Sequence, residues 1–314
     1  MEGGERGTLQ HLGFNYDYQI LRRAPSAAGP ENQLELPPTL FLGGAFQSMK
    51  SWTRFVETFI PRCDVILVDL PGSGASDLLP ARYGLDFLVD ALEQLVRRLH
   101  LPPLYLVAAS YGSPVAYQFA RRFPERISHL TLSGIARRIP DRLRSVIERS
   151  VREALAEETD ALIQTTTSRL LCTDPTKPID RRRLAARVLA SGIRQMTAHD
   201  RAKYVANSNR LLEAPPLDLS DPPGVRCLVF TGEFDVFTTP EDCLEVARSI
   251  PGAAYTTIPR ADHLFHVEQF QLTQELIVAF GAGSLRRAHE DRIHVVYPCA
   301  PKDRSGQSPL RHTA

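Results

Sequence analysis

Short apolar runs and segments of helical periodicity alternate along the first part of the chain. Apolar runs of about four to eight residues bounded by turn residues are typical of buried strands. They predict strands at 16–23, 39–42, 63–69, 104–108 and 127–133. Apolar residues three and four positions apart predict helices between these strands, at 51–60 with Ser51 as the N-cap, at 84–100 and at 115–123. Strands separated by helices imply right-handed crossovers and a mostly parallel sheet.

The alternation stops after residue 133. The apolar spacing then stays helical as far as residue 223, and the alternation resumes with strands at 225–231 and 254–258 and helices at 240–250 and 267–280. A helical insertion between two strands of such a sheet predicts a cap above their carboxyl ends. We therefore expect an α/β core in two parts, at 11–134 and 224–283, a helical cap at 135–223 and a polar, basic tail at 284–314. We expect residues 24–38 to form a loop and much of the tail to be mobile.

Composition and charge place the chain among ordinary globular proteins. Of its 314 residues 43% are hydrophobic and 23% are charged, and the net charge of +1 gives no sign of a nucleic-acid partner. The first ten residues are polar and not a signal peptide, and no apolar run reaches the length of a membrane span. The five cysteines form no C-x-x-C pair, which favours free thiols in a reducing compartment. We therefore expect a cytoplasmic protein.

A serine lies in the turn between a predicted strand and a predicted helix. The turn reads Ala108-x-Ser110-x-Gly112, close to the Gly-x-Ser-x-Gly pattern of a nucleophile elbow. Small residues are needed two positions before and after the serine because strand and helix approach closely there, and alanine meets that need nearly as well as glycine. An ordinary strand-to-helix loop is the alternative, so the partners of Ser110 must decide.

A nucleophilic serine needs a base and a carboxylate that orients the base, in the chain order Ser, acid, His. Asp235 follows the strand predicted at 225–231, and His263 follows the strand predicted at 254–258. All three residues therefore lie beyond the carboxyl ends of strands, the edge where open α/β sheets place their sites. The imidazole would take the serine proton, and the carboxylate would hold the imidazole in the required tautomer.

Three residues compete for these roles. His266 lies further than His263 from the end of the predicted strand, and we expect it to be a packing or surface residue. Glu233 lies where the chain is still turning, and Asp141 belongs to the predicted cap. We therefore favour Asp235 as the acid and His263 as the base.

Acyl transfer also requires donors for the developing oxyanion. The elbow aims the backbone N–H of Tyr111 at the space above the serine. The second N–H should come from the loop after an early strand, and we assign it to Ala45 in Gly43-Gly44-Ala45-Phe46. Phe46 and Tyr111 are the side chains that we expect in the substrate pocket.

The remaining motifs predict no cofactor and no metal. The stretch from Asp69 to Ser76 contains Gly72 and Gly74 but lacks the Gly-Lys-Ser/Thr of a phosphate loop, so it predicts a tight turn with Ser76 as a helper or cap. No set of His, Cys and Asp has the spacing of a metal site.

Arginines are frequent in the predicted cap. A solvated helical face is the default interpretation, and a docking face for an acidic partner such as an acyl carrier protein is the alternative. The residues are Arg137, Arg138, Arg142, Arg144, Arg181, Arg182, Arg183 and Arg187.

The order of elements and the three marked residues resemble the α/β-hydrolase superfamily from Tyr16 to Phe280. Four stretches, 43–46, 64–71, 109–112 and 235–242, resemble more closely the rhamnolipid-pathway 3-hydroxyacyl acyltransferase family. The resemblance implies an α/β-hydrolase fold with a helical cap. It also implies an acyl-enzyme formed from an acyl thioester, with Ser110, Asp235 and His263 as the triad. Tyr111 stands where that family has Trp, and Gly43 where Asn is more usual.

We therefore expect a serine hydrolase or acyltransferase acting on a fatty-acyl or polyketide thioester, presented by a carrier protein or coenzyme A. A carboxylesterase or lactonase acting on a small ester is the alternative, and a non-catalytic relative is a third. The acyl length, the acceptor and the oligomeric state stay open.

Overall fold

The protein is described by a computed structural model over residues 4–23, 34–285 and 293–298. Within these residues eight strands form one sheet in the order β1-β2-β4-β3-β5-β6-β7-β8. Their bounds are β1 Glu5–His11, β2 Phe14–Leu21, β3 Thr39–Leu42, β4 Val65–Asp69, β5 Leu104–Ala109, β6 Ile127–Ser133, β7 Arg226–Gly232 and β8 Ala254–Ile258. Neighbouring strands from β4 to β8 are parallel, and β2 is antiparallel to both β1 and β4. The predicted α/β-hydrolase fold, with its mostly parallel sheet, is thus confirmed.

Strand β1 was missed, because the sequence predicts no strand before Tyr16. The strand lies at the edge of the sheet and most of its side chains are exposed or half-buried, so it carries no apolar run. Leu12 and Gly13 connect it to β2 with φ of 44° and 91°. A two-residue connection with positive φ at both positions matches the right-handed twist of a hairpin.

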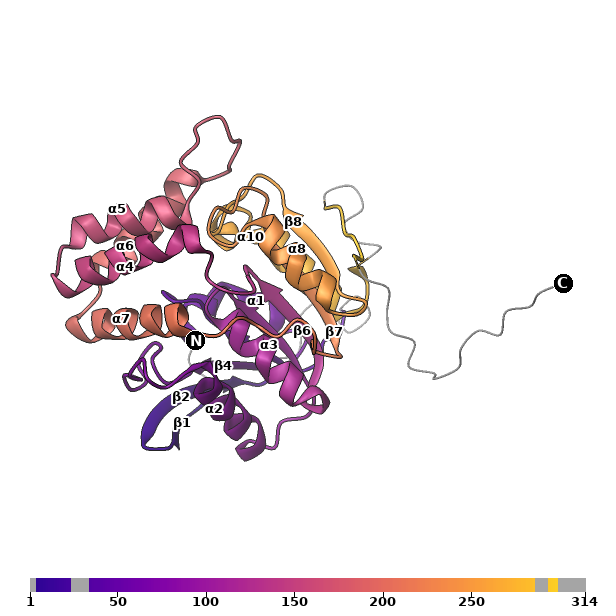
Figure 1. The fold of residues 1–314 in the computed structure, drawn as a ribbon. Helices are drawn as coiled ribbons and strands as arrows, with labels where there is room; N and C mark the ends of the chain where they lie inside the picture. Colours follow the sequence, from indigo (N-terminus) through magenta and orange to yellow (C-terminus); the bar gives the residue numbers. More distant parts are fainter. Residues whose placement is uncertain (1–3, 24–33, 286–292, 299–314) are drawn as a thin grey trace.

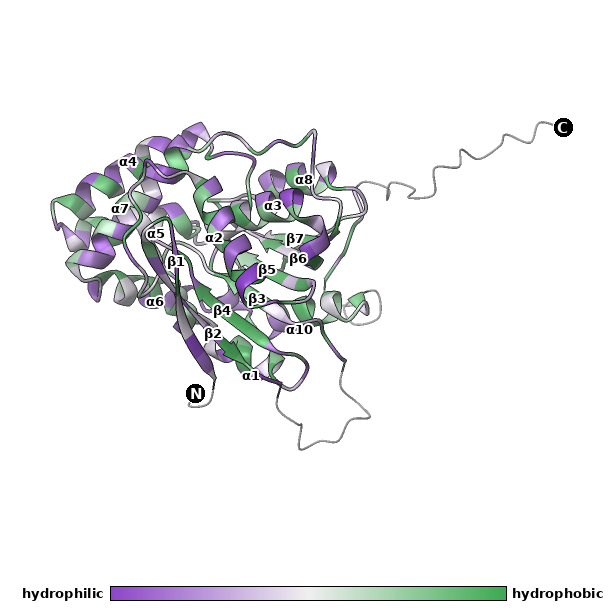
Figure 2. Ribbon diagram, turned by 90° about the horizontal axis from the view of Figure 1, so that it is seen from below, coloured by the Kyte–Doolittle hydropathy of each residue, from purple (hydrophilic) through white to green (hydrophobic). Residues whose placement is uncertain are grey.

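Five helices cover the two faces of the sheet (Figure 1). On one face lie α2 (Leu85–Arg98), α3 (Gly112–Arg122) and α8 (Pro240–Ser249), and on the other lie α1 (Thr53–Phe59) and α10 (Phe270–Gly281). Adjacent strand residues point to opposite faces, so Leu40 packs with the first group and Phe41 with the second. The central strands are accordingly hydrophobic along their length, whereas each helix carries both hydrophobic and hydrophilic residues (Figure 2).

The predicted helices differ from the observed ones by up to three residues at their ends, as at Gly112 of α3, and two of them also differ in how they begin. Ser51 is not an N-cap but the third residue of a 3₁₀ helix at Met49–Trp52, and its hydroxyl accepts a hydrogen bond from the Ser48 N–H at 3.2 Å. The helix expected at 267–280 is divided into α9 (Phe265–Glu268) and α10 by Gln269. In both places a short helical turn precedes the longer helix. The spacing of apolar residues does not separate the two, because it is similar in both.

Four helices lie between β6 and β7: α4 (Asp141–Leu155), α5 (Thr159–Leu170), α6 (Arg182–Arg194) and α7 (Ala198–Glu213). They share a separate apolar cluster that includes Leu143, Leu162, Leu189 and Tyr204 and that reaches Phe237 beyond β7. Figure 1 shows them stacked together, with α7 between the other three and the sheet. This arrangement places a helical layer over the edge where β5, β7 and β8 end.

The last described residues pack on the sheet. Ile293 is buried, and Val296 and Tyr255 exchange backbone hydrogen bonds of 2.8 Å in an antiparallel bridge. The rest of the tail, from 299 onward and at 286–292, and the loop at 24–33 lie outside the described residues. Among the described helices none is both long and apolar enough to span a membrane.

Candidate active site

Ser110 lies in the turn that joins β5 to α3. Its φ is 47°, in the left-handed region that a non-glycine residue rarely adopts, so the turn is sharp and strained. A Cβ on Gly112 would come within 2.9 Å of the Gly43 carbonyl oxygen and 3.0 Å of Leu42, which explains the glycine there. The backbone N–H of Ser110 donates to the Ser133 carbonyl at 2.8 Å, tying the turn to the neighbouring strand. This is the geometry expected of a nucleophile elbow.

The three side chains chosen from the sequence meet at this edge of the sheet. Ser110 Oγ lies 3.1 Å from His263 Nε2, and His263 Nδ1 lies 2.8 Å from Asp235 Oδ2. With the proton on Nδ1, the imidazole donates to Asp235 and accepts from the Ser110 hydroxyl. Asp235 and His263 are buried, so the hydrogen-bonded chain is shielded from water except at the serine.

Asp235 is held by more donors than the imidazole alone. The backbone N–H groups of Phe237 and Thr238 donate to Oδ1 at 2.8 and 3.0 Å. The hydroxyls of Thr231 and Thr238 donate to Oδ2 at 2.5 and 3.0 Å. These bonds fix the carboxylate in place, and two of the donors are hydroxyls of threonines that were not among the predicted site residues.

Part of the stretch 235–242, in which Thr238-Thr-Pro-Glu-Asp242 follows the acid, has a local structural role. Thr239 is the N-cap of α8, and its hydroxyl accepts from the Asp242 N–H at 3.2 Å while the Asp242 carboxylate accepts from the Thr239 N–H at 3.0 Å. This is a reciprocal helix cap, and its Thr-x-x-Asp spacing was visible in the sequence.

The competing residues lie elsewhere. The carboxylate of Glu233 accepts from the backbone N–H of Arg260 at 2.9 Å, and Asp141 is an exposed residue paired with Arg138 at 3.6 Å. His266 is half-buried beside the site, and desolvation of its ring, with a smaller contribution from His263, lowers its pKa to about 4. His266 was expected to be a packing or surface residue, and its neutral imidazole packs in the wall of the cavity that Ser110 and His263 also line.

The loop after β3 lies against the serine. A Cβ on Gly44 would come within 3.3 Å of Ser110 Cβ, and Ala45 lines the same cavity as Ser110 and Tyr111. Gln47, which the sequence did not indicate, braces this loop: its Oε1 accepts from the Gly44 N–H at 2.7 Å, and its Nε2 lies 3.4 Å from His266 Nε2.

Above the serine lies a cavity of about 560 Å³. Its wall is mainly apolar and is built from both the sheet loops and the helices α4–α7, with Phe46, Leu189, Phe237 and Phe265 among its residues. Phe46 and Tyr111, predicted as pocket residues, both line it. The Tyr111 hydroxyl is hydrogen-bonded to Asn207 and Arg210, at 3.1 and 2.7 Å, so this side chain is also fixed to α7.

A second cavity of about 760 Å³ adjoins the first. The rings of Phe46 and Tyr204, stacked with centroids 5.2 Å apart, line both cavities. The walls of the second cavity are more polar and include the loop from Gly72 to Ala75. In that loop Gly72 and Gly74 have positive φ, and the Ser76 hydroxyl donates to the Asp69 carbonyl, as a tight turn requires. Across the described ranges no cluster of His, Cys, Asp and Glu could hold a metal ion.

Most of the chain is similar to known hydrolases. The model of the alpha/beta hydrolase fold family matches residues 37–270. The pimeloyl-[acyl-carrier protein] methyl ester esterase of Chromobacterium violaceum is 28% identical over 236 residues, 73% of this chain and 86% of that protein. The poly(3-hydroxyalkanoate) depolymerase of Ectopseudomonas oleovorans is 28% identical over 120 residues, 38% of this chain and 41% of that protein.

Solved structures agree in fold. The enol-lactonase from Burkholderia xenovorans has a TM-score of 0.72 at 20% identity, covering 87% of this chain and 99% of its own. An alpha/beta hydrolase enzyme from a Medee basin deep-sea metagenome library has the same TM-score and identity, covering 87% of this chain and 96% of its own. The superfamily resemblance is thus confirmed, while the finer resemblance to the rhamnolipid-pathway acyltransferases stays a prediction. The family match spans the elbow and the loops that carry both partners of Ser110, and this chain belongs to the alpha/beta hydrolase fold family.

Proposed function

We propose that this protein is a serine hydrolase that cleaves a carboxylic ester or thioester through an acyl-enzyme on Ser110. The observation that carries the proposal is the unbroken hydrogen-bonded chain from Ser110 through His263 to Asp235, with contacts of 3.1 and 2.8 Å. Membership of the family and relatives that are named as esterases and hydrolases support it.

The chain of contacts suggests each proton transfer. His263 Nε2 takes the hydroxyl proton as Ser110 Oγ attacks the carbonyl carbon, and Asp235 stabilises the imidazolium that forms. The bond to the leaving oxygen or sulfur breaks, and His263 gives its proton to the leaving group. Water then attacks the acyl-enzyme, His263 takes a proton from it, and the acid leaves as the Ser110 hydroxyl is restored.

The N–H groups of Ala45 and Tyr111 are the proposed oxyanion donors. Both residues line the cavity beside Ser110, and neither N–H donates to another residue in the described part of the chain. Donors already in place when the charge develops are worth about 3 kcal/mol each in comparable sites.

The cavity favours an apolar acyl chain. Leu184 and Val188 of α6 are 38% and 48% exposed although they line it, so an apolar surface continues to its mouth. Covering such a surface with the substrate is favourable by about 25 cal/mol for each Å² removed from water.

A carrier-linked acyl group is the finer proposal. The relative from Chromobacterium violaceum is named for an ester on an acyl carrier protein, and Arg181 lines the cavity with Arg183 and Arg187 exposed nearby on the same helical segment. Three of the other arginines are already paired: Arg137 with Glu245, Arg138 with Asp141 and Arg142 with Asp242. None of the relatives named above is a rhamnolipid-pathway acyltransferase, so we propose water as the acceptor.

The test is covalent labelling with a fluorophosphonate probe and turnover of p-nitrophenyl esters. We expect Ser110→Ala to lose labelling and to reduce turnover by about 10⁴-fold or more while the fold is retained, because the members of such a triad act as a unit. Ser145→Ala, an exposed serine of α4, is the matched control and should keep both. Labelling that persists in Ser110→Ala would contradict the proposal.

A higher kcat/KM on acyl-carrier-protein thioesters than on p-nitrophenyl esters would support the carrier-linked substrate, and the reverse order would favour a small ester.

A further inference from the structure

A buried arginine shares the cavity with the candidate nucleophile. Arg169 of α5 is 6% exposed and lines the same 560 Å³ space as Ser110 and His263. Its guanidinium carbon lies 5.5 Å from the centre of the Phe237 ring, and that ring lies 5.1 Å from the ring of His263. The positive charge is therefore separated from the catalytic imidazole by a single aromatic side chain.

The partners of Arg169 are uncharged. Nη1 donates to Ser150 Oγ at 3.2 Å and Nη2 donates to the Tyr204 hydroxyl at 3.4 Å, both long for bonds from a guanidinium. The two hydroxyls are occupied with each other as well, because Tyr204 donates to Ser150 at 2.6 Å and Ser150 donates to the Ile147 carbonyl at 2.7 Å. The buried Nε of Arg169 has no hydrogen-bond partner among the described residues.

No carboxylate of the described chain forms an ion pair with Arg169. Glu153 of α4 is the buried carboxylate of this helical layer, but its Oε1 accepts from Arg149 at 2.7 Å and from the Thr165 hydroxyl at 2.9 Å, and its Oε2 has no hydrogen-bond partner among the described residues. An arginine does not deprotonate in proteins, so its charge persists in the apolar cavity. Burying such a charge without a counter-ion is costly, and a planar guanidinium is the side chain best matched to a carboxylate.

We propose that Arg169 binds a carboxylate of the substrate, separate from the ester or thioester that Ser110 attacks; the inference rests on the function proposed above. The substrate is then an acidic ester, in which a few carbons that fit against Phe237 and Leu189 connect the scissile carbonyl to the second acidic group. Arg54 and Arg181 also line the cavity, but both are exposed, and Arg54 lies over the ring of Phe270 at 3.6 Å. Among the arginines of that wall Arg169 is the buried one, and its guanidinium has no carboxylate partner in the described part of the chain.

The test compares esters that differ only in a terminal carboxylate. In the acyl series, p-nitrophenyl hydrogen adipate is compared with p-nitrophenyl hexanoate; in the alcohol series, the butyrate ester of ω-hydroxyhexanoate is compared with hexyl butyrate. We expect the wild type to favour the carboxylated ester by about tenfold or more in kcat/KM in one series, which also identifies the side that carries the acid. No preference in either series would overturn the inference.

Variants separate recognition from packing. Arg169→Met should remove the preference chiefly through KM and leave the neutral ester within about threefold, and Arg169→Lys should retain part of it. Arg152→Met, which removes an exposed charge of α4 outside both cavities, is the control. Equal loss on both esters in Arg169→Met would assign Arg169 a structural role instead.

A binding measurement does not depend on turnover. Calorimetric titration with adipate and with hexanoate should show adipate binding to the wild type that Arg169→Met abolishes. If no ester is cleaved and no probe is bound but adipate still binds through Arg169, the proposed function fails while the carboxylate site stands. If esters are cleaved and adipate does not bind, the carboxylate site fails alone.

Discussion

At the scale of single residues, the site depends on side chains that hold other side chains in place. Thr231 and Thr238 orient Asp235, and Asp235 orients His263. Gln47 does the same for the loop that carries the proposed oxyanion donor, since it joins the Gly44 N–H to His266. Because burial keeps His266 neutral, its Nε2 can accept the hydrogen bond from the Gln47 amide.

Replacement of Gln47 tests this role. We expect Gln47→Ala to lower kcat about tenfold with little change in KM, because the loop loses its brace while the cavity wall stays. Gln271→Ala, on the exposed side of α10, is the control. Steady-state kinetics on one p-nitrophenyl ester decides, and a change confined to KM would mean that Gln47 binds substrate instead of positioning the loop.

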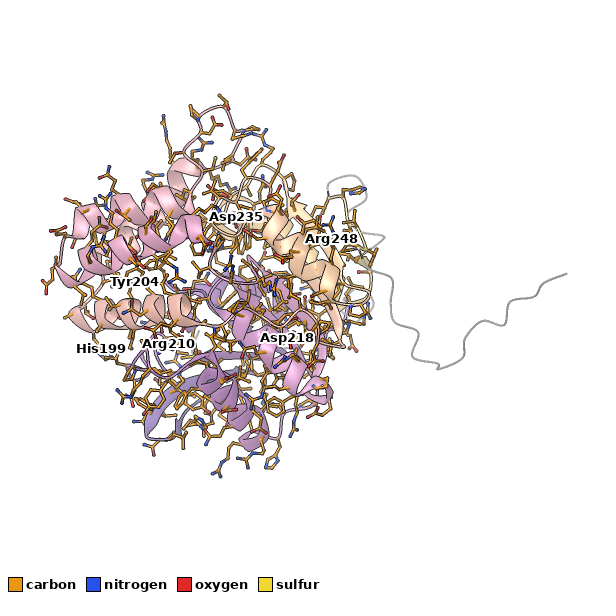
Figure 3. The ribbon with its side chains drawn as sticks, in the orientation of Figure 1. His199, Tyr204, Arg210, Asp218, Asp235 and Arg248 are labelled. Carbon is orange, nitrogen blue, oxygen red and sulfur yellow. The ribbon has the colours of Figure 1, made fainter. Side chains whose placement is uncertain are left out.

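At the scale of elements, α7 connects the helical layer to the α/β core. Figure 3 shows Tyr204 and Arg210 on this helix. Arg210 is 1% exposed, and its guanidinium donates to the carbonyls of Leu79 and Tyr83 at 2.7 and 2.6 Å and to the Tyr111 hydroxyl at 2.7 Å. One side chain thus ties α7 both to the loop before α2 and to the elbow.

Removal of this side chain should destabilise the protein. In Arg210→Leu the carbonyls of Leu79 and Tyr83 lose their donor in a buried place, and we expect the free energy of unfolding to fall by about 2–4 kcal/mol. Urea denaturation followed by circular dichroism measures it, with Arg187→Leu as the surface control. A loss no greater than that of the control would show that α7 is held by its apolar contacts alone.

At the scale of the whole molecule, a buried acidic pair joins the helical layer to the end of the sheet. Asp262 is fully buried beside His263, and its carboxylate accepts from the Cys172 N–H, beyond α5, at 3.1 Å. Its own N–H donates to Glu268 Oε2 at 2.7 Å. Burial, reinforced by the neighbouring Asp262, raises the pKa of Glu268 to about 8, so the folded protein retains a proton there at neutral pH.

The sign of the pH dependence follows from this raised pKa. Between the pKa of an unfolded glutamate, about 4.3, and the folded value, the folded state holds a proton that the unfolded state has lost. This group therefore lowers stability as pH rises through that window, by at most about 1.4 kcal/mol per pH unit, and its contribution levels off above the folded pKa. Urea midpoints measured from about pH 5 to pH 8 should fall less steeply in Glu268→Gln than in the wild type. Identical pH profiles for the two proteins would contradict the assignment.

The local order of apolar and polar residues predicted much of the architecture and the three residues of the proposed triad. Seven of the eight strands were predicted, most of them from apolar runs that form because both faces of the sheet are covered, and Ser110, Asp235 and His263 each follow a predicted strand in the order Ser, acid, His. Strand β1 was not readable, because an exposed edge strand needs no apolar face. The place of His266 in the cavity wall was not predicted, because a histidine carries no local sign of burial.

The sequence by itself determined where strands, turns and helices form and which residues stand at strand ends, because backbone sterics and apolar periodicity act over a few neighbouring positions. Only the tertiary structure decided what those residues meet. Gln47 reaches His266 across 219 positions of chain, and Arg169 lies in a cavity whose floor is Ser110. Such contacts depend on how the helices between β6 and β7 pack on the sheet. That Arg169 is buried without a carboxylate partner follows only from the positions of all its neighbours.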